Sequence, residues 1–532
     1  MYLQQHLRKK GNKTYKTVYL AESYREDGKV KKRYIANLSE CPDNIIAAIK
    51  NELNQSTEIF PSKTSALLFE QGKSFGGIFT ILEVCKRLGI TQSLGKDIRQ
   101  SGLALFQIAA RILCQRSRNY AANGWLPLVA AEDLLHLDAF NEDTLYANLD
   151  WLCENQEKIE RKLFQFRNKN NTEAKTVYLY DVTSSYFEGT QNELAAFGYN
   201  RDKKKGKMQI VIGLLCDESG YPISVQVFEG NTQDTATIGD QLKKLQETFG
   251  IKHVVMVGDR GMIKSASIDE MINLKWHYIT AITTPQIKTL LKEGVIQLDL
   301  FEEKLAEIWQ EDIRYLLRRN PVRMQEIANT RNKKIEKVKL LAQAKINYLA
   351  AHPKASVEVA LKHVNKKAAN LKIKELLTIT AIGRSITVTI VKEKLIEAAQ
   401  LDGCYILKSN VPENEADKET LHKRYKDLAM VEHAFRTMKQ SFEEMQPIYV
   451  RKETRTRGHV FVCMLSYMIM KYIWDECKDI ESTQAAIYDN LSAIHYLQYT
   501  IENATIKKLP DRLNETQTKI INKLKIKLPT ML

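Results

Sequence analysis

A change of hydrophobic period at about Lys175 constrains the fold of this 532-residue chain more than any other feature. Before it, apolar side chains recur at helical spacing from about Ser65 to Phe166. After it, a segment rich in Val, Tyr and Thr predicts a strand, and further strands and helices alternate with it. These are strands at 176–187, 208–216, 222–229, 253–258 and 276–283, with helices from 232 to about 249 and at 264–274. Three strands in a meander, then helix, strand, helix and strand, predict an α/β fold with a mixed sheet.

The rest of the chain differs in pattern from this central part. Segments 15–24 and 29–38 flank Glu26-Asp27-Gly28 and predict a β-hairpin. Residues 322–350 predict a helix whose apolar stripe lies under a basic surface. We therefore expect a basic N-terminal hairpin region (1–60), a helical region (61–170), a core in two parts (171–283 and 421–480), an α+β insertion domain (284–420) and a C-terminal helical tail (481–532).

Positive charge is concentrated in two separate segments. The formal net charge is +15, and residues 1–35 carry ten Lys and Arg against Glu22, Glu26 and Asp27. Residues 321–374 carry thirteen Lys and Arg against three Glu. A single basic stretch is usually a solvated helix face, but two of them favour contact with a polyanion such as nucleic acid.

The cysteine pattern and the N-terminus indicate the compartment. Eight Cys are scattered singly, without the spacing of a zinc site or a disulfide framework. The N-terminus lacks the apolar core of a signal peptide, and the longest apolar run, Val460–Met470, is too short to span a bilayer. We expect a buried helix there, no membrane partner, and a location in the reducing cytoplasm.

Two aspartates stand in or beside predicted strands. Asp181 lies among Tyr and Val, where an uncompensated carboxylate is costly to bury, so a cation is one explanation. A solvated strand edge, or a hydrogen bond to Thr183, is the other. Asp259 follows the strand ending at Gly258, and the alternative for it is a turn Asp that caps the next helix.

Glu432 is the most informative acidic residue. On one continuous helix, Tyr425, Leu428, Glu432 and Lys439 share a face that is otherwise suited to burial. The alternative is a surface ion pair of Glu432 with Arg436. Two strand aspartates and a helical glutamate supply the hard oxygen ligands that Mg²⁺ or Mn²⁺ takes, which predicts phosphodiester chemistry.

The order of these residues resembles the DDE transposases, which have a ribonuclease-H-like core. Tyr425, Glu432 and Lys439 are similar to the Tyr-x2-Arg-x3-Glu-x6-Lys signature of the insertion-sequence-four superfamily, and residues 258–262 and 431–439 are also similar to that group. The resemblance covers about 175–475. The signature's Arg falls at Leu428, so Arg424 or Arg436 is expected to contact the phosphate instead.

The resemblance implies a transposase that binds the inverted terminal repeats of a mobile element, cleaves its ends and joins them to target DNA. It implies Asp181, Asp259 and Glu432 as catalytic residues and ligands of two Mg²⁺ ions (or Mn²⁺), and Tyr425, Lys439 and Arg436 as DNA contacts. Residues 1–165 are expected to read the ends, and the protein to pair two ends as a homodimer. The alternatives are an inactive DNA-binding derivative and a junction-cutting nuclease with the same core.

Two tryptophans offer a different contact. Trp276 and Trp309 both have rings suited to stacking on an unpaired base. For Trp276, which lies in a predicted strand, packing in the core is the favoured interpretation.

Overall fold

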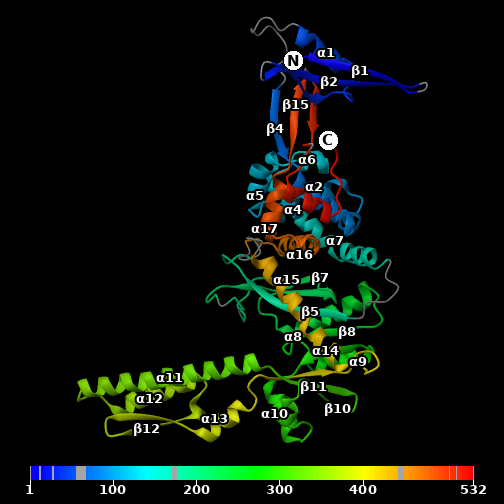
Figure 1. The fold of residues 1–532 in the computed structure, drawn as a ribbon. Coiled ribbons are helices and arrows are strands. Elements are labelled where there is room, and N and C mark those ends of the chain that lie inside the picture. Colours follow the sequence, from blue (N-terminus) through cyan, green and yellow to red (C-terminus); the bar gives the residue numbers. More distant parts are fainter. Residues whose placement is uncertain are drawn as a thin grey trace. The chain divides into compact units, whose positions relative to one another are not determined.

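The computed structural model describes residues 2–10, 13–26, 29–54, 68–169, 177–199, 201–202, 204–440, 449–501, 504–510 and 512–530. The chain divides into two compact units, Met1–Phe69 with Tyr499–Ile506, and Glu70–Gln498 with Lys507–Leu532. Figure 1 shows the elements of both.

The first unit contains a three-stranded antiparallel sheet of β1 (Tyr2–Lys10), β2 (Lys13–Glu26) and β3 (Lys29–Asn37), followed by α1 (Asp43–Asn54). Strands β2 and β3 confirm the expected hairpin, although Asp27 and Gly28 of its turn lie outside the described residues. Strand β1 was not expected, because its run of Gln, Lys and Arg has no apolar alternation. It forms by pairing with β2.

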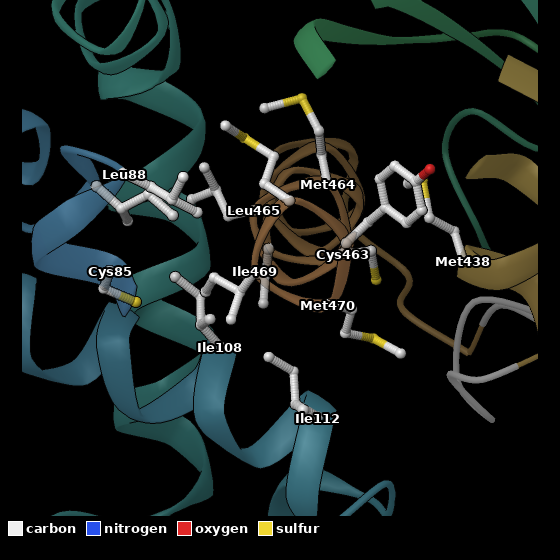
Figure 2. Close-up of a cluster of buried hydrophobic side chains, with 14 of the residues drawn as sticks. Cys85, Leu88, Ile108, Ile112, Met438, Cys463, Met464, Leu465, Ile469 and Met470 are labelled. Atoms are coloured by element: carbon white, nitrogen blue, oxygen red, sulfur yellow. The ribbon is translucent and has the colours of Figure 1, made fainter. Parts of the chain in front are cut away.

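The second unit begins with helices packed around one long apolar helix, α16 (Glu453–Cys477). The elements before the sheet are β4 (Leu68–Ser74), α2 (Gly76–Arg87), α3 (Ile90–Leu94), α4 (Ile98–Leu113), α5 (Arg118–Tyr120), α6 (Ala131–Leu135) and α7 (Glu142–Asn168). Figure 2 shows α16 between α4, which contributes Ile108 and Ile112, and Met438 of α15 (Leu428–Gln440). The expected burial of Val460–Met470 is confirmed, since every residue of this run is buried.

Helices α7 and α16 approach each other closely at Gly458. A Cβ added to Gly458 would lie 2.2 Å from the carbonyl oxygen of Leu149. The absence of a side chain at this position therefore allows the two backbones to touch.

The central feature of the second unit is an eight-stranded mixed sheet with the order β10-β11-β14-β9-β8-β5-β6-β7. Strands β5, β6 and β7 form the expected antiparallel meander, and β8 and β9 are parallel to β5. This arrangement confirms the mixed ribonuclease-H-like sheet with flanking helices. The bounds are β5 Val177–Tyr186, β6 Gln209–Asp217, β7 Pro222–Phe228, α8 Asp234–Lys243, β8 Val255–Gly258, α9 Ser265–Asn273 and β9 His277–Ala281.

The segment expected as an insertion domain adds strands to this sheet and also forms a separate group of helices and strands with its own apolar core. Its elements are α10 (Thr284–Lys292), β10 (Ala306–Gln310), β11 (Ile313–Arg319), α11 (Pro321–Ala351), α12 (Val357–Asn370), β12 (Leu377–Ile382), β13 (Ser385–Ile390), α13 (Lys392–Ala399) and β14 (Cys404–Ser409). Strands β10, β11 and β14 extend the sheet beyond β9. Helices α11 and α12 pack on each other and on the β12–β13 hairpin (Figure 1). This packing buries a separate apolar core that includes Ile335, Val338, Ala342 and Leu349 of the expected stripe.

The C-terminal region differs from the helical tail that we expected. It has α17 (Gln484–Ser492) and α18 (Glu515–Lys523), but also strands β15 (His495–Ile501) and β16 (Ala504–Lys508). The short runs of these strands carry no local turn signal. They form a sheet of order β16-β15-β4, in which β15 pairs with the distant β4 and β16 pairs with β15. Among the described residues, no helix could cross a membrane.

Candidate active site

The register of the parallel strands brings Asp181 and Asp259 together. In β5 and β8, Tyr180 pairs with Gly258, so Asp181 and Asp259 follow at the same level of two neighbouring strands. Side chains at matching positions of adjacent parallel strands point to the same face. Their carboxylates are held in the same way, since Oδ1 of each accepts a hydrogen bond of 2.8 Å from the next backbone N–H, of Val182 and Arg260.

Asp259 does not cap the next helix, which was the alternative interpretation. Helix α9 begins at Ser265, and its N-cap is Lys264. The carboxylate instead accepts a hydrogen bond of 3.3 Å from the hydroxyl of Tyr425. This bond links the end of β8 to α14 (Lys418–Lys426).

Glu432 is carried by a second helix and not by the continuous one that we expected. Helix α14 ends at Lys426 and α15 begins at Leu428, with Asp427 as a turn between them. The Asp427 N–H bonds to the carbonyls of Lys423 and Arg424, which closes the first helix. The shared helix face of the sequence prediction is therefore wrong for Tyr425, although Glu432 and Lys439 both lie on α15.

All these residues nevertheless line one cleft of about 780 Å³. Its walls come from β5, the end of β8, β9, α10, β14, α14 and α15. The predicted residues that line it are Asp181, Asp259, Tyr425, Leu428, Glu432, Arg436 and Lys439. No ion pair joins the exposed Glu432 to Arg436, and both side chains are described, so the surface-pair alternative finds no support.

Asp181 has the most perturbed carboxyl group in the cleft. Its pKa is raised to about 7, mainly by burial and also by the nearby charges of Glu432 and Asp259, while the Val182 N–H and Arg201 act in the opposite direction. Carboxylates of like charge that lie near one another are stable together when a cation compensates them.

The donor set fits a hard divalent cation. Three carboxylates without a thiolate or imidazole among them are the oxygen ligands that Mg²⁺ and Mn²⁺ prefer. The charge crowding at Asp181 indicates that such an ion would be stabilising. Within the described residues, however, no three His, Cys, Asp or Glu side chains are already close enough to hold a metal.

Lys439 is already engaged by the protein. Its Nζ forms an ion pair of 2.9 Å with Asp202 and also donates to the carbonyl of Ser184 on β5. Burial lowers the pKa of Lys439, and the bond to Asp202 acts in the opposite direction. Lys439 thus fixes α15 to the loop that follows β5.

Several cations of the cleft were missed or misplaced by the sequence prediction. Arg201, Arg260 and Lys426 line the cleft in addition to Arg436. Arg424, one of the two residues expected to replace the signature arginine, is not among the lining residues. Leu428 lines the cleft as an almost buried apolar side chain. Arg201 carries no recognisable spacing in the sequence, and its position follows only from the fold of the β5–β6 loop.

A buried histidine supports the wall beside Tyr425. His422 Nε2 accepts hydrogen bonds of 2.6 Å from the hydroxyl of Tyr405 and 3.2 Å from Arg318. Since both partners donate to Nε2, the imidazole is neutral with its proton on Nδ1. The pKa of His422 is lowered to about 4, mainly by burial and also by the charges of Lys426 and Arg318.

This histidine predicts a loss of stability in acid. The unfolded chain protonates His422 below about pH 6.5, whereas the folded chain resists protonation down to about pH 4. The contribution of neutral His422 to the free energy of unfolding is therefore fully present above pH 6.5. It decreases as the pH falls toward 4, and about 2 kcal/mol is lost at pH 5. We expect the thermal unfolding midpoint of the wild type to fall more between pH 7.5 and pH 5 than that of His422→Gln. An equal fall in both proteins would contradict the assignment.

Comparison with known proteins identifies the family. Residues 172–469 match the family model described as the transposase DDE domain, and because this is more than half of the chain, the protein belongs to that family. Residues 6–63 match the model of the N-terminal domain of IS1634 family transposases. The chain is therefore a DDE transposase of an insertion sequence, an enzyme class that cleaves and transfers DNA strands with divalent metal ions.

Solved structures give weaker likenesses. The piggyBac transposase synaptic complex with hairpin DNA is 11% identical, with a TM-score of 0.34, over 78% of this chain and 70% of that one. The Mos1 transposase paired-end complex with the left transposon end is 10% identical, with a TM-score of 0.15, over 45% and 68%. No curated protein matches the chain.

Proposed function

We propose that the protein binds the inverted terminal repeats of its own element, cleaves the DNA at these ends and joins the freed 3′-hydroxyls to target DNA. The observation that carries the proposal is the convergence of Asp181, Asp259 and Glu432 on one cleft, from two neighbouring strands and a helix. The resemblance of Tyr425, Glu432 and Lys439 to the insertion-sequence-four signature supports it, although Leu428 departs from that signature.

In this proposal the three carboxylates hold two Mg²⁺ ions, with Mn²⁺ as a substitute. Bound divalent ions supply activation of an attacking water or 3′-hydroxyl and stabilisation of the leaving oxygen at phosphorus. The hydroxyl of Tyr425 orients the carboxylate of Asp259, and Lys439 holds α15 against β5 so that Glu432 faces Asp181. Arg436 and the other cations of the cleft contact the phosphates of the DNA end.

In the same proposal, segments outside the cleft bind DNA. Residues 1–165 read the terminal repeats, and the basic segment 321–374 on α11 and α12 contacts phosphates without sequence preference. Lys333, Lys337, Lys362 and Lys366 of these helices are exposed, which suits that role. Such binding weakens steeply as salt rises. Pairing of two ends by a homodimer belongs to the same proposal.

The test is a joining assay. A labelled duplex that ends in the element's terminal repeat, taken from the DNA that flanks the coding region, is incubated with a supercoiled plasmid and Mg²⁺. We expect labelled strands to become covalently joined to the plasmid, and EDTA to prevent this. Cleavage of the duplex without any joining would favour a junction-cutting nuclease and would contradict the proposal.

A further inference from the structure

The loop after β5 displays the two most exposed aromatic rings of the described chain. The side chains of Phe197 and Tyr199 are 69% and 84% exposed. Leaving two such rings in water gives up a large amount of favourable burial. An exposed pair of this kind on one short segment indicates a surface that becomes covered by a partner.

This loop, which we call the aromatic loop (residues 196–199 and 201–202), is held firmly. Ala196 and Gln209 exchange two backbone hydrogen bonds, and the Gln209 Nε2 donates to the carbonyls of Tyr199 and Gly230. Gly198 lies so close to the backbone of Gly230 that a Cβ added to Gly198 would be 2.1 Å from the Gly230 carbonyl oxygen. The rings are therefore presented by a fixed backbone.

The far end of the aromatic loop is fixed to the active site. The backbone N–H of Arg201 donates to Ser184 on β5, and its guanidinium forms an ion pair of 2.5 Å with Asp234. Asp202 forms the ion pair with Lys439 of α15. Any strand that lies on the aromatic loop would thus continue into the cleft.

A second hollow adjoins the cleft at this point. It has a volume of about 310 Å³, and Arg201 lines both cavities. Its other lining residues include Tyr199, Gln209, Thr232, Asp234 and Lys264. Within the described residues, the Oε1 of Gln209 accepts no hydrogen bond. An aromatic ring at the edge, cationic side chains and polar groups inside match the chemistry of a nucleotide better than that of an apolar ligand.

We infer that the aromatic loop and this hollow form a subsite for unpaired DNA nucleotides next to the cleaved phosphate. Phe197 and Tyr199 stack on bases, and Arg201 contacts the phosphate that connects the subsite to the cleft. The neighbouring Lys204 and Lys205 are exposed and add to the attraction for the strand. The inference rests on the proposed function, because it assigns to the unpaired strand a place beside the same reaction centre.

Trp309 provides a matched control. It is an exposed aromatic residue, but it lies on the edge strand β10, which four strands separate from β5, the strand that precedes the aromatic loop. Its ring centroid is 4.9 Å from the guanidinium of Arg314. One face of this ring is therefore already covered. The sequence offered Trp309 as a stacking residue, and the aromatic loop is better placed for that role.

The experiment measures DNA binding without catalysis. Fluorescence anisotropy in EDTA is recorded for the full-length chain with a labelled oligothymidylate, with the same strand made of abasic sugar phosphates, and with a duplex. The Phe197→Leu/Tyr199→Leu variant retains apolar volume but lacks the flat rings. We expect it to bind oligothymidylate about tenfold or more weakly, because stacking contributes strongly to the affinity for each base. Its binding to the abasic strand and to the duplex is expected to stay within about twofold of the wild type.

Other outcomes would overturn the inference. An equal loss on all three DNAs would indicate a general electrostatic or folding effect, and the thermal unfolding midpoint identifies the latter. No loss on oligothymidylate, or an equal loss with Trp309→Leu, would exclude the aromatic loop as the stacking surface. Because no strand is joined in this experiment, its result is independent of the joining assay.

Discussion

Replacing Glu432 with Gln is expected to reduce strand joining by about a thousandfold or more. The substitution keeps the size and polarity of the side chain but removes the negative charge that a divalent ion requires. Loss of a metal ligand removes several kcal/mol of stabilisation from the transition state. DNA binding is expected to persist, since the cations Arg201, Arg260 and Arg436 of the cleft are unchanged.

The measurement combines the joining assay with anisotropy on the same terminal duplex. Glu419→Gln is the matched control, because Glu419 is exposed on the neighbouring helix α14 and does not line the cleft. That control is expected to join strands at the wild-type rate. Equal joining by Glu432→Gln and the wild type would remove Glu432 from the reaction and leave the carboxylate site without support.

The second large effect is a loss of folding stability, caused by a substitution in the core of the second unit. Gly458→Ala is expected to destabilise the protein by about 3 kcal/mol or more, because the new Cβ would lie 2.2 Å from a backbone oxygen of α7. Neither helix can move away without disturbing the packing of α16, so the cost is at the upper end for an overpacked core.

Gly239 provides the opposite case on another helix. It lies within α8, and a Cβ added there meets only Glu270, at 3.9 Å. Gly239→Ala is expected to stabilise the protein by roughly 0.5–1 kcal/mol, since Ala favours the helix. Thermal unfolding of both variants beside the wild type gives the comparison. A midpoint for Gly458→Ala at or above that of the wild type would show that α7 and α16 do not touch as described.

Much of the sheet was predictable from local patterns. The strands from β5 to β9 and the burial of α16 follow from alternating or continuous apolar runs, which depend on nearby residues. The strands near the two ends of the chain were not predictable from local patterns. Strand β1 lacks apolar alternation. Strand β15 depends on pairing with β4, several hundred residues away in the chain, and β16 depends on pairing with β15.

The candidate active site also combines residues that local sequence could identify with contacts that depend on the fold. Asp181 and Asp259 could be singled out because a carboxylate in or next to an apolar strand is unusual, and the pairing of Tyr180 with Gly258 explains why they are adjacent. The break at Asp427 was not visible, because residues on both sides of it favour a helix. The ion pair of Lys439 with Asp202 joins residues that no spacing relates, so only the folded chain could reveal it.

The way in which α11 leaves the sheet has a consequence for how such chains diversify. β11 and β14 are adjacent antiparallel strands, with Arg319 opposite Cys404, and the N–H of Asn320 bonds to the carbonyl of Gly403 at 2.8 Å. The departure and return points of residues 321–402 therefore touch. A module attached through two touching points is free to grow, shrink or be exchanged, while the strands that hold the carboxylates keep their register.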